Sequence, residues 1–380
     1  MQIEIVSDIS TLDKAQWNSV FSSGYPFCQY DFLLALEQGA SVNGDTGWQS
    51  QHLIVRQDGK LIAAMPAYLK WHSYGEYLFD WQFADAYKQH GLPYYPKLIS
   101  AIPFTPAQGP RLGVAASYQQ GDMFALITNA LVNLVNTSDL SQFQCLYASD
   151  NEQPEFQRAG FQQRLDVQFL WHNRGYQQFD DFLAQLMSRK RKQIRKERML
   201  VAEQGICIRT LRGDNLTADF WQQFYRFYCA TYKKRSGHQG YLTLATFLQW
   251  GAQMKANIVV FAAFKQHEMV AAALCFSSDD TLYGRYWGGN ADFSQLHFEC
   301  CYYAGIEYCI EHQLKYFDAG AQGEHKLQRG FEPVTRAGFY YMKPTVLSAA
   351  VEDYIIREQQ AVQQYMAGAK ALLPYKQQQD

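Results

Sequence analysis

Side chains that could perform proton transfer gather between residues 282 and 333, where the sequence reads LYGRYWGGNADFSQLHFECCYYAGIEYCIEHQLKYFDAGAQGEHKLQRGFEP. Carboxylates and neutral imidazoles accept protons, and a tyrosine hydroxyl can orient a substrate or donate a proton. This chemistry gives the candidate catalytic residues Glu299, Asp318, His325 and Tyr283.

Each candidate also has a simpler structural interpretation. Glu299 shares a helical stripe with Tyr303 and Glu307, which is typical of a solvated face, and an acid in a first helical turn is favoured by the dipole alone. Asp318 ends a predicted strand. His325 is a lone histidine in a turn bracketed by glycines, and such a histidine often has only a structural role.

Cationic side chains in the same stretch are suited to holding a phosphate or a carboxylate. Lys326 and Arg329 lie three residues apart, just before Gly330 as a helix stop, and Arg285 lies on a strand beside Tyr283. We interpret all three cations as ligands of an anionic substrate group. The alternative for Arg285 and Tyr283 is a stacked strand face.

The elements that position these residues follow from periodicity. A strand from residue 282, a helix over 296–312 and a strand over 315–318 form a crossover unit, whose two strands should be parallel. Ligands bind such units at the carboxyl ends of the strands, where Gly288 and Gly289 fall. Glycine inside a strand is tolerated where a ligand or another backbone approaches closely, so we assign Gly288 and Gly289 to cofactor binding.

A second cationic segment, SRKRKQIRKER, lies within a helix predicted over 180–202. Like charges at helical spacing repel each other, so their concentration favours contact with an anion, and we select Lys190, Arg191 and Arg195 for this role. The partner could be the phosphates of a cofactor, a lipid-linked precursor or an RNA. The alternative is a solvated helix face.

Composition limits the class of protein. At 380 residues two domains are expected, and a net charge of -2 excludes a global field that would drive the chain onto nucleic acid or anionic lipid. We expect a cytoplasmic protein, because no secretory signal or membrane-spanning run is visible. The eight cysteines form no CxxC pair, which favours a reduced protein without a metal.

The first half of the chain contains a hairpin around the turn Asp58-Gly59 and, after it, an aromatic insertion over 71–100. This insertion mixes many Tyr, Trp and Phe residues with charges. Because so much ring surface is costly to leave in water, it should form either a cap over the sheet or a wall of a substrate cleft.

The two halves repeat one order of elements: strand, helices, hairpin, third strand, helix, fifth strand. This order matches the acyltransferase fold of the GNAT superfamily, duplicated. The blocks YLKWHSYGEYLFDW, YYPKL, PFTPAQGPRLG, LYGRYWGG and AGAQGEHKLQRGFEP, among others between residues 48 and 333, resemble the bacterial FemAB-like family of peptidoglycan biosynthesis or recognition. The fold class expected is therefore α/β (α+β) with tandem GNAT-like domains over 1–175 and 176–345, followed by a helical tail over 346–380.

The resemblance implies transfer of an acyl or aminoacyl group to an amine, with acyl-CoA or aminoacyl-tRNA as the donor and no metal. The acceptor would be a small molecule or a cell-wall precursor. The glycine motif of CoA-binding GNAT enzymes fits only partly at residues 285–290, which favours an RNA-linked or other donor. A tRNA-dependent aminoacyltransferase and a non-catalytic binding protein stay open as alternatives. The segment TRAGFY (335–340) replaces a Ser/His/Trp-bearing strand of the family pattern, so we assign no catalytic residue to that strand.

Overall fold

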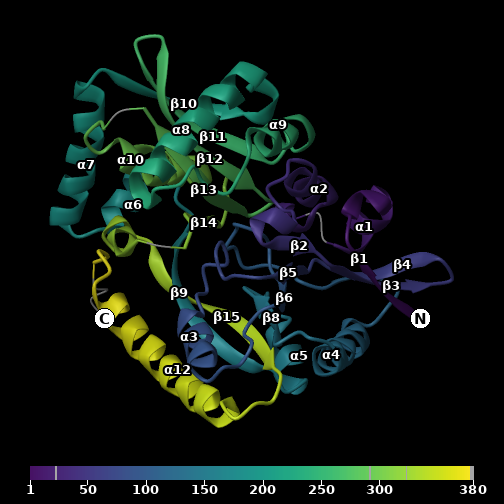
Figure 1. The fold of residues 1–380 in the computed structure, drawn as a ribbon. Coiled ribbons are helices and arrows are strands. Elements are labelled where there is room, and N and C mark those ends of the chain that lie inside the picture. The colour runs from purple at the N-terminus through teal and green to yellow at the C-terminus, as the bar shows by residue number, and fades with distance from the viewer. Residues whose placement is uncertain (22–23, 291, 322, 377–380) are drawn as a thin grey trace. The chain divides into compact units, whose positions relative to one another are not determined.

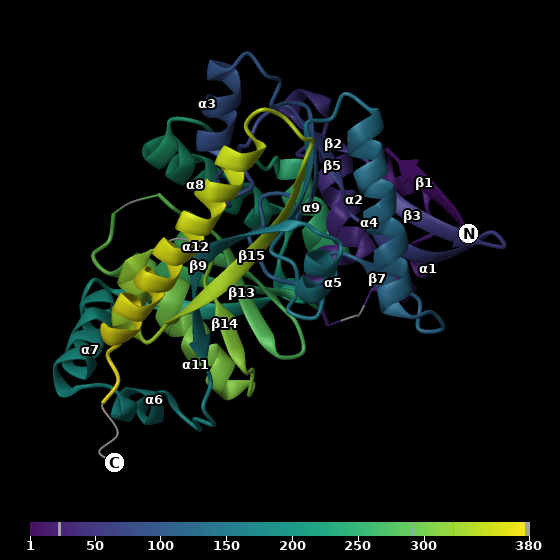
Figure 2. The ribbon, with the colours of Figure 1, turned by 90° about the horizontal axis from the view of Figure 1, so that it is seen from below.

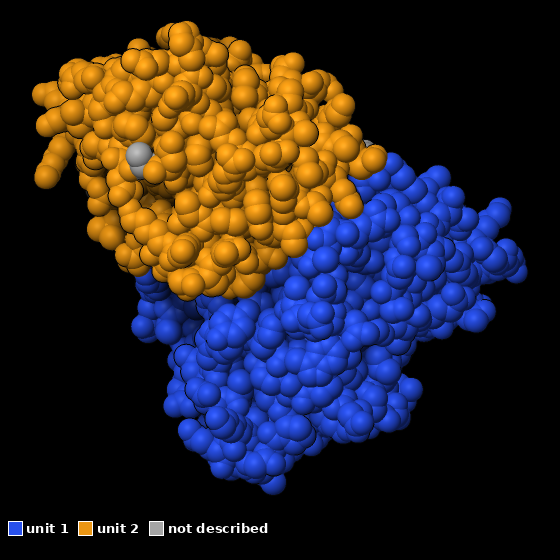
Figure 3. All heavy atoms as spheres, turned by 45° about the horizontal axis from the view of Figure 1, so that its top comes forward, with its two compact units in different colours: residues 1–167, 335–365 blue, residues 168–334, 366–380 orange. Residues whose placement is uncertain are grey.

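The computed structural model describes residues 1–21, 24–290, 292–321 and 323–376. It divides into two compact units (Figure 3). Unit 1 comprises Met1–Val167 and Thr335–Tyr365, and unit 2 comprises Gln168–Val334 and Met366–Asp380. The chain therefore passes from unit 1 to unit 2 within one strand, β9 (Gln162–His172), and returns within another, β15 (Glu332–Met342). This exchange of segments differs from the consecutive domains expected from the sequence.

Unit 1 contains a four-stranded antiparallel sheet in the order β1-β3-β4-β7 and a second set of paired strands in the order β2-β5-β6-β8-β15 (Figure 1). Its strands before β9 are β1 (Gln2–Val6), β2 (Trp48–Ser50), β3 (His52–Gln57), β4 (Lys60–Met65), β5 (Tyr68–Lys70), β6 (Lys97–Ser100), β7 (Gly113–Val114) and β8 (Gln142–Leu146). Its helices before β9 are α1 (Lys14–Val20), α2 (Tyr30–Gln38), α3 (Trp81–Gln89), α4 (Gln120–Thr137) and α5 (Gln153–Arg158). The predicted hairpin is present as β3 and β4.

Unit 2 has one sheet in the order β10-β11-β12-β13-β14-β9. Its own strands are β10 (Ile206–Arg212), β11 (Ile258–Lys265), β12 (Glu268–Ser277), β13 (Thr281–Gly289) and β14 (Tyr316–Asp318). Its helices are α6 (Phe179–Gln185), α7 (Ser188–Glu203), α8 (Ala218–Ser236), α9 (Leu244–Gln253), α10 (Leu296–Phe298) and α11 (Ala304–Glu311), with α12 (Ser348–Ala371) shared between the units. Helix α11 packs on β13 and β14, where Figure 2 shows it beneath them, and α8 packs along β13.

Alternating apolar residues explain both cores. In unit 1 the core centres on β3, β4, β8 and the buried side of α4, which contributes Phe124, Ile127 and Leu131. In unit 2 the central strands β11 and β12 are buried along almost their whole length, as expected for strands covered on both faces. The predicted helix over 296–312 is present, but its middle is a π-helical turn, Glu299–Tyr303.

The aromatic insertion packs as a cap on unit 1. Helix α3 buries Phe83 and Tyr87 against Leu347, which precedes α12, and against Val351 and Ile355 of the first half of α12. Tyr94 completes this cluster. The rings that stay exposed are Trp71, Tyr74, Phe79 and Trp81.

Candidate active site

The most distinctive feature of unit 2 is the parting of two parallel strands. β13 and β14 pair only through Thr281–Tyr316, Leu282–Phe317 and Tyr283–Asp318. β14 then ends, whereas β13 continues to Gly289 and keeps its pairing with β12 on its other side. The sheet therefore opens beyond Tyr283 and Asp318, at the carboxyl ends where the sequence predicts a ligand.

A β-bulge places Arg285 at this opening. Cys275 of β12 faces Gly284 and Leu274 faces Tyr286, so Arg285 is the extra residue of β13. Bulges often redirect a side chain next to a functional site. The Arg285 side chain is 2% exposed, and its Nη2 lies 3.2 Å from Oδ2 of Asp318. Asp318 Oδ1 also accepts a hydrogen bond from the Gly320 backbone N–H at 2.9 Å.

A 3-10 turn, Glu324–Arg329, returns cationic and imidazole side chains to the opening. Left-handed backbone at Gly323 and Gly330 (φ 115° and 85°) allows the chain to enter and leave this turn. Lys326 is buried, and its Nζ donates to the Gly320 carbonyl at 2.5 Å. Burial lowers the pKa of Lys326 to about 7, although Asp318 opposes this shift.

His325 lies beside Lys326 and is more accessible to solvent than Lys326. Its Nε2 is 2.8 Å from the hydroxyl of Tyr302, which lies in the π-helical turn. Partial burial, followed by the charges of Arg329, Lys326 and Arg235, lowers the pKa of His325, which favours a neutral imidazole at neutral pH. A neutral imidazole held by a hydroxyl can accept a proton.

Sequence reasoning missed two partners of His325. The ring of His297, from α10, lies 6.4 Å from the ring of His325 between centroids, and burial lowers the pKa of His297 to about 3. The second partner that sequence reasoning missed is Tyr302, whose hydroxyl contacts His325. The only sequence signal was the block LHFECCYY, whose aromatic and imidazole residues follow helical spacing.

Arg329 is held by contacts with neighbouring groups of unit 2. Its Nη2 is 2.9 Å from Oε2 of Glu197 on α7, its Nη1 donates to the His325 carbonyl at 2.9 Å, and its guanidinium lies 3.5 Å from the ring centre of Phe298. The Glu197 carboxylate also accepts a hydrogen bond from the Tyr303 hydroxyl. Arg329 therefore fixes the 3-10 turn that carries His325 and Lys326.

Glu299 lies apart from this group and faces α7. Its carboxylate is 3.0 Å from Nη2 of Arg198, and burial raises its pKa against the opposing effect of Arg198. Tyr283 is buried at the end of the paired segment, and burial raises its pKa to about 12.

The two candidate cofactor glycines of β13 have neighbours within the protein. A Cβ on Gly288 would lie 2.4 Å from the Phe227 carbonyl carbon and 2.5 Å from the Tyr228 nitrogen of α8. A Cβ on Gly289 would lie 3.1 Å from the Cβ of Ala271. At Gly288, close approach of a helix backbone is sufficient reason for glycine.

The three cations selected on the basic segment lie on α7, and each has a side-chain partner. Arg195 pairs with Asp180 at 2.8 Å, Lys190 donates to Gln328 at 2.8 Å, and Arg191 donates to Ser188 at 3.4 Å. Arg195 and its neighbours Arg189, Lys192 and Lys196 are exposed. These contacts leave a strongly cationic helix face toward solvent.

The corresponding strands of unit 1 are closed. β6 and β8 are parallel, and an isolated bridge between Gly109 and Ala148 extends the pairing beyond them. The buried guanidinium of Arg111 fills the adjacent space and donates to the carbonyls of Ala107 (2.7 Å) and Leu146 (2.9 Å). Of these two parallel strand pairs, β13–β14 of unit 2 is therefore the one that parts next to polar side chains.

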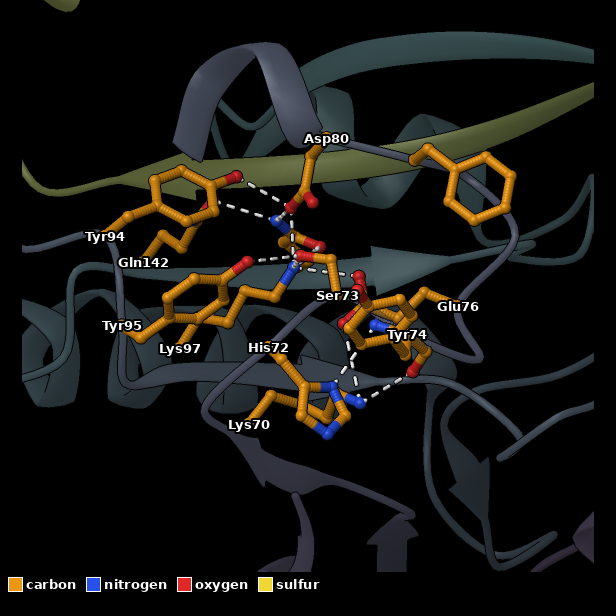
Figure 4. A network of polar contacts seen from close by, with 12 residues as sticks. Lys70, His72, Ser73, Tyr74, Glu76, Asp80, Tyr94, Tyr95, Lys97 and Gln142 are labelled. Atoms are coloured by element: carbon orange, nitrogen blue, oxygen red, sulfur yellow. Dashed lines mark hydrogen bonds and ion pairs between the residues drawn. The ribbon is translucent and has the colours of Figure 1, made fainter. Parts of the chain in front are cut away.

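Unit 1 instead contains a buried charge network within the insertion (Figure 4). Lys97 Nζ contacts Asp80 at 2.5 Å, Glu76 at 2.8 Å and Ser73 at 2.9 Å, and all the charged side chains are inaccessible to solvent. Burial raises the pKa of Glu76 to about 7. For Asp80, burial is outweighed by Lys97 and by hydrogen bonds, and the pKa falls to about 2. This network anchors the insertion rather than forming an accessible site.

In the described part of the chain, no cluster of His, Cys, Asp and Glu side chains has the arrangement of a metal site. A search for long apolar helices over the same residues finds none able to span a membrane.

Known proteins share this fold. The match to a crystal structure of FemX covers 93% of this chain and 100% of the FemX chain, at 11% identity and with a TM-score of 0.54. The match to L-PGS from Bacillus licheniformis covers 89% of this chain and 98% of the L-PGS chain, at 9% identity and with a TM-score of 0.52. The match to the C-terminal domain of a putative lysylphosphatidylglycerol synthetase from Agrobacterium fabrum covers 86% of this chain and 95% of that domain, at 11% identity and with a TM-score of 0.50. At these identities the likeness shows the fold alone, and it confirms the predicted α/β (α+β) fold class.

Sequence comparison gives the family. A search of curated proteins finds no match to the chain. The family model described as FemAB-like, peptidoglycan biosynthesis/recognition, matches residues 8–377, which is nearly the whole chain. This protein belongs to the FemAB-like family.

Proposed function

We propose that unit 2 transfers an acyl or aminoacyl group from an activated donor to an amine. The observation that supports this most is the parting of β13 and β14 next to a charged cluster of Arg285, Asp318 and Lys326. Parted strands offer backbone hydrogen-bonding groups to an extended donor, and preorganised groups of this kind supply much of the catalysis of acyl transfer.

The residues then have distinct roles. His325, neutral and held by Tyr302, accepts a proton from the attacking amine. The amine nitrogen bonds to the donor carbonyl carbon, and the carbonyl oxygen takes the negative charge. Lys326 and Arg285 are the nearby cations that stabilise this charge, and Asp318 orients Arg285. Collapse of the intermediate expels the thiolate or ribose oxygen of the donor, which takes up a proton.

The acceptor we favour is an amine of a small molecule or a cell-wall precursor, in line with the family description of peptidoglycan biosynthesis/recognition. The donor is acyl-CoA or aminoacyl-tRNA and is a substrate rather than a resident cofactor. The cytoplasm, where both donors occur, is the compartment we propose.

A donor panel tests this function. The protein would be incubated with acyl-CoA thioesters of increasing length and with charged tRNA, and with amine acceptors, and acylated product would be measured by mass spectrometry. His325→Asn should lower kcat by about 10²–10⁴-fold, the usual contribution of a general base. His267→Asn, in the exposed turn between β11 and β12, is the matched control and should keep activity.

Donor binding without turnover over the whole panel would contradict the transfer proposal and favour a non-catalytic binding protein. Equal activity in His325→Asn and His267→Asn would remove His325 as the base.

A tRNA donor is the second candidate, because α7 presents an exposed cationic face. It predicts tRNA binding that weakens as salt rises, and that weakens further when Arg191 and Arg195 become Ala. Lys60→Ala and Arg158→Ala remove exposed cations of unit 1 and serve as the control. tRNA binding that is unaffected by the α7 changes would exclude this donor.

A further inference from the structure

A cavity of about 380 Å³ lies between α7, β10 and the segment formed by the π-helical turn and α11. Its lining residues are Arg198, Val201, Ala202, Ile206, Ile208, Thr210, Glu299, Ala304 and Glu307. None of these residues belongs to the group around Asp318 and Lys326. Ligand pockets in proteins commonly have volumes from about 300 Å³ upward.

The π-helical turn creates this cavity. An uninterrupted α-helix would place Tyr303 on the same stripe as Glu299 and Glu307. In the π turn the Ala304 N–H donates to the Glu299 carbonyl, one residue further back in the chain than the acceptor it would have in an α-helix. Tyr303 is thereby buried with its hydroxyl on Glu197, and the small Ala304 faces the space. π-helical turns occur frequently at functional sites.

The walls of the cavity divide into an apolar part and a charged part. Alternate residues of β10, Ile206 and Ile208, form the apolar wall together with Val201. At the charged side, Nη2 of Arg198 lies 3.0 Å from Glu299 and 2.8 Å from Glu307. The Glu299 side chain is 7% exposed, whereas that of Glu307 is 49% exposed and marks the open side.

The charges determine which ligand fits. Two carboxylates share one guanidinium, so the ionised group carries a net charge of −1. The Arg198 guanidinium is also 4.6 Å from the ring centre of Phe179, a contact that holds it in place. A cation with an apolar body would complete the charge balance, whereas an anion would meet two carboxylates.

We propose that this cavity is a second binding site, which takes a primary ammonium group bearing a compact aliphatic chain. The ammonium group would bind Glu307 and Glu299, and the chain would lie along Ile206, Ile208 and Val201. The site is independent of the proposed transfer reaction.

The test uses three probes of equal chain length: n-hexylammonium, hexanol and hexanoate. Calorimetric titration of the full chain should show saturable binding of hexylammonium, with hexanol at least about tenfold weaker and no binding of hexanoate. Glu307→Gln should weaken hexylammonium binding by about tenfold. Glu311→Gln removes the same charge one turn further along α11, outside the cavity, and should leave the affinity unchanged.

Ala304→Leu fills the cavity and should abolish binding, with thermal unfolding used to verify that the variant is folded. Equal affinities for the three probes, no binding of hexylammonium by the wild-type chain, or an equal loss in Glu307→Gln and Glu311→Gln would each overturn the proposal.

Discussion

At the scale of single residues, Lys326 combines full burial with an ionisable group. Its pKa is lowered from 10.5 to about 7 in the folded chain because burial disfavours the charged amine. Between these two values the unfolded chain binds more protons than the folded chain. This group therefore makes the free energy of unfolding rise as pH increases above 7.

Lys326→Met should remove that pH dependence. The wild-type chain should gain about 2 kcal/mol relative to the variant between pH 7 and pH 9, measured by urea unfolding at each pH. Parallel stability curves for the two proteins over this range would contradict the shifted pKa.

The residues also show how far sequence reasoning reaches. Asp318 was predicted at a strand end, Arg285 on the neighbouring strand and Lys326 in the turn that follows. The structure places the charges of Arg285 and Lys326 beside Asp318. Arg329 and Glu299 were assigned from local spacing, but each pairs with a side chain of α7 more than 100 residues earlier in the chain. No local pattern contains that information.

At the scale of elements, Gly288 decides how closely α8 approaches β13. Gly288→Ala would place a Cβ 2.4 Å from the Phe227 backbone, so the helix must move, and we expect a loss of about 1–3 kcal/mol in stability. Gly284→Ala on the same strand is the control, since its nearest contact would be an ordinary 3.4 Å. If Gly288→Ala instead weakens donor binding and leaves the melting temperature unchanged, the glycine allows the close approach of a ligand rather than that of α8.

The aromatic insertion depends on Lys97. Lys97→Met leaves Glu76 and Asp80 buried without their main cationic partner, and breaking a buried ion pair costs about 3–5 kcal/mol. Urea unfolding at pH 7 should show this loss, while Lys88→Met on the exposed side of α3 should change little. Equal stabilities of the two variants would show that the network does not anchor the insertion.

Elements were more predictable than their details. The hairpins, the long helices and the parallel arrangement of β13 and β14 follow from turn residues and periodicity. The π-helical turn does not, because the burial of Tyr303 on Glu197 depends on tertiary packing.

At the scale of the whole molecule, each unit takes a strand segment from the other half of the sequence. Gly338–Met342 of β15 pairs with Gln142–Leu146 of β8 in unit 1, and His172–Leu170 of β9 pairs with β14 in unit 2. The sequence predicts the duplication but not this exchange, because each boundary between the units falls inside a strand, β9 or β15.

A chain ending at Val334 should therefore lose protection in unit 1. Hydrogen exchange at the β8 amides should accelerate, because β15 is missing on one side of that strand. A chain ending at Tyr365 keeps β15 and removes only a segment of unit 2, so β8 should stay protected. Rapid exchange of β8 in both truncated chains would contradict this role of β15.

The exchanged strand also sets an order of events during translation. β15 pairs with β8 but is synthesised only after more than 330 residues. Until then, one edge of β8 in nascent unit 1 is unpaired. Unpaired strand edges are aggregation-prone. Unit 2, whose borrowed segment of β9 is synthesised before its other strands, is free of this delay and can assemble its sheet first.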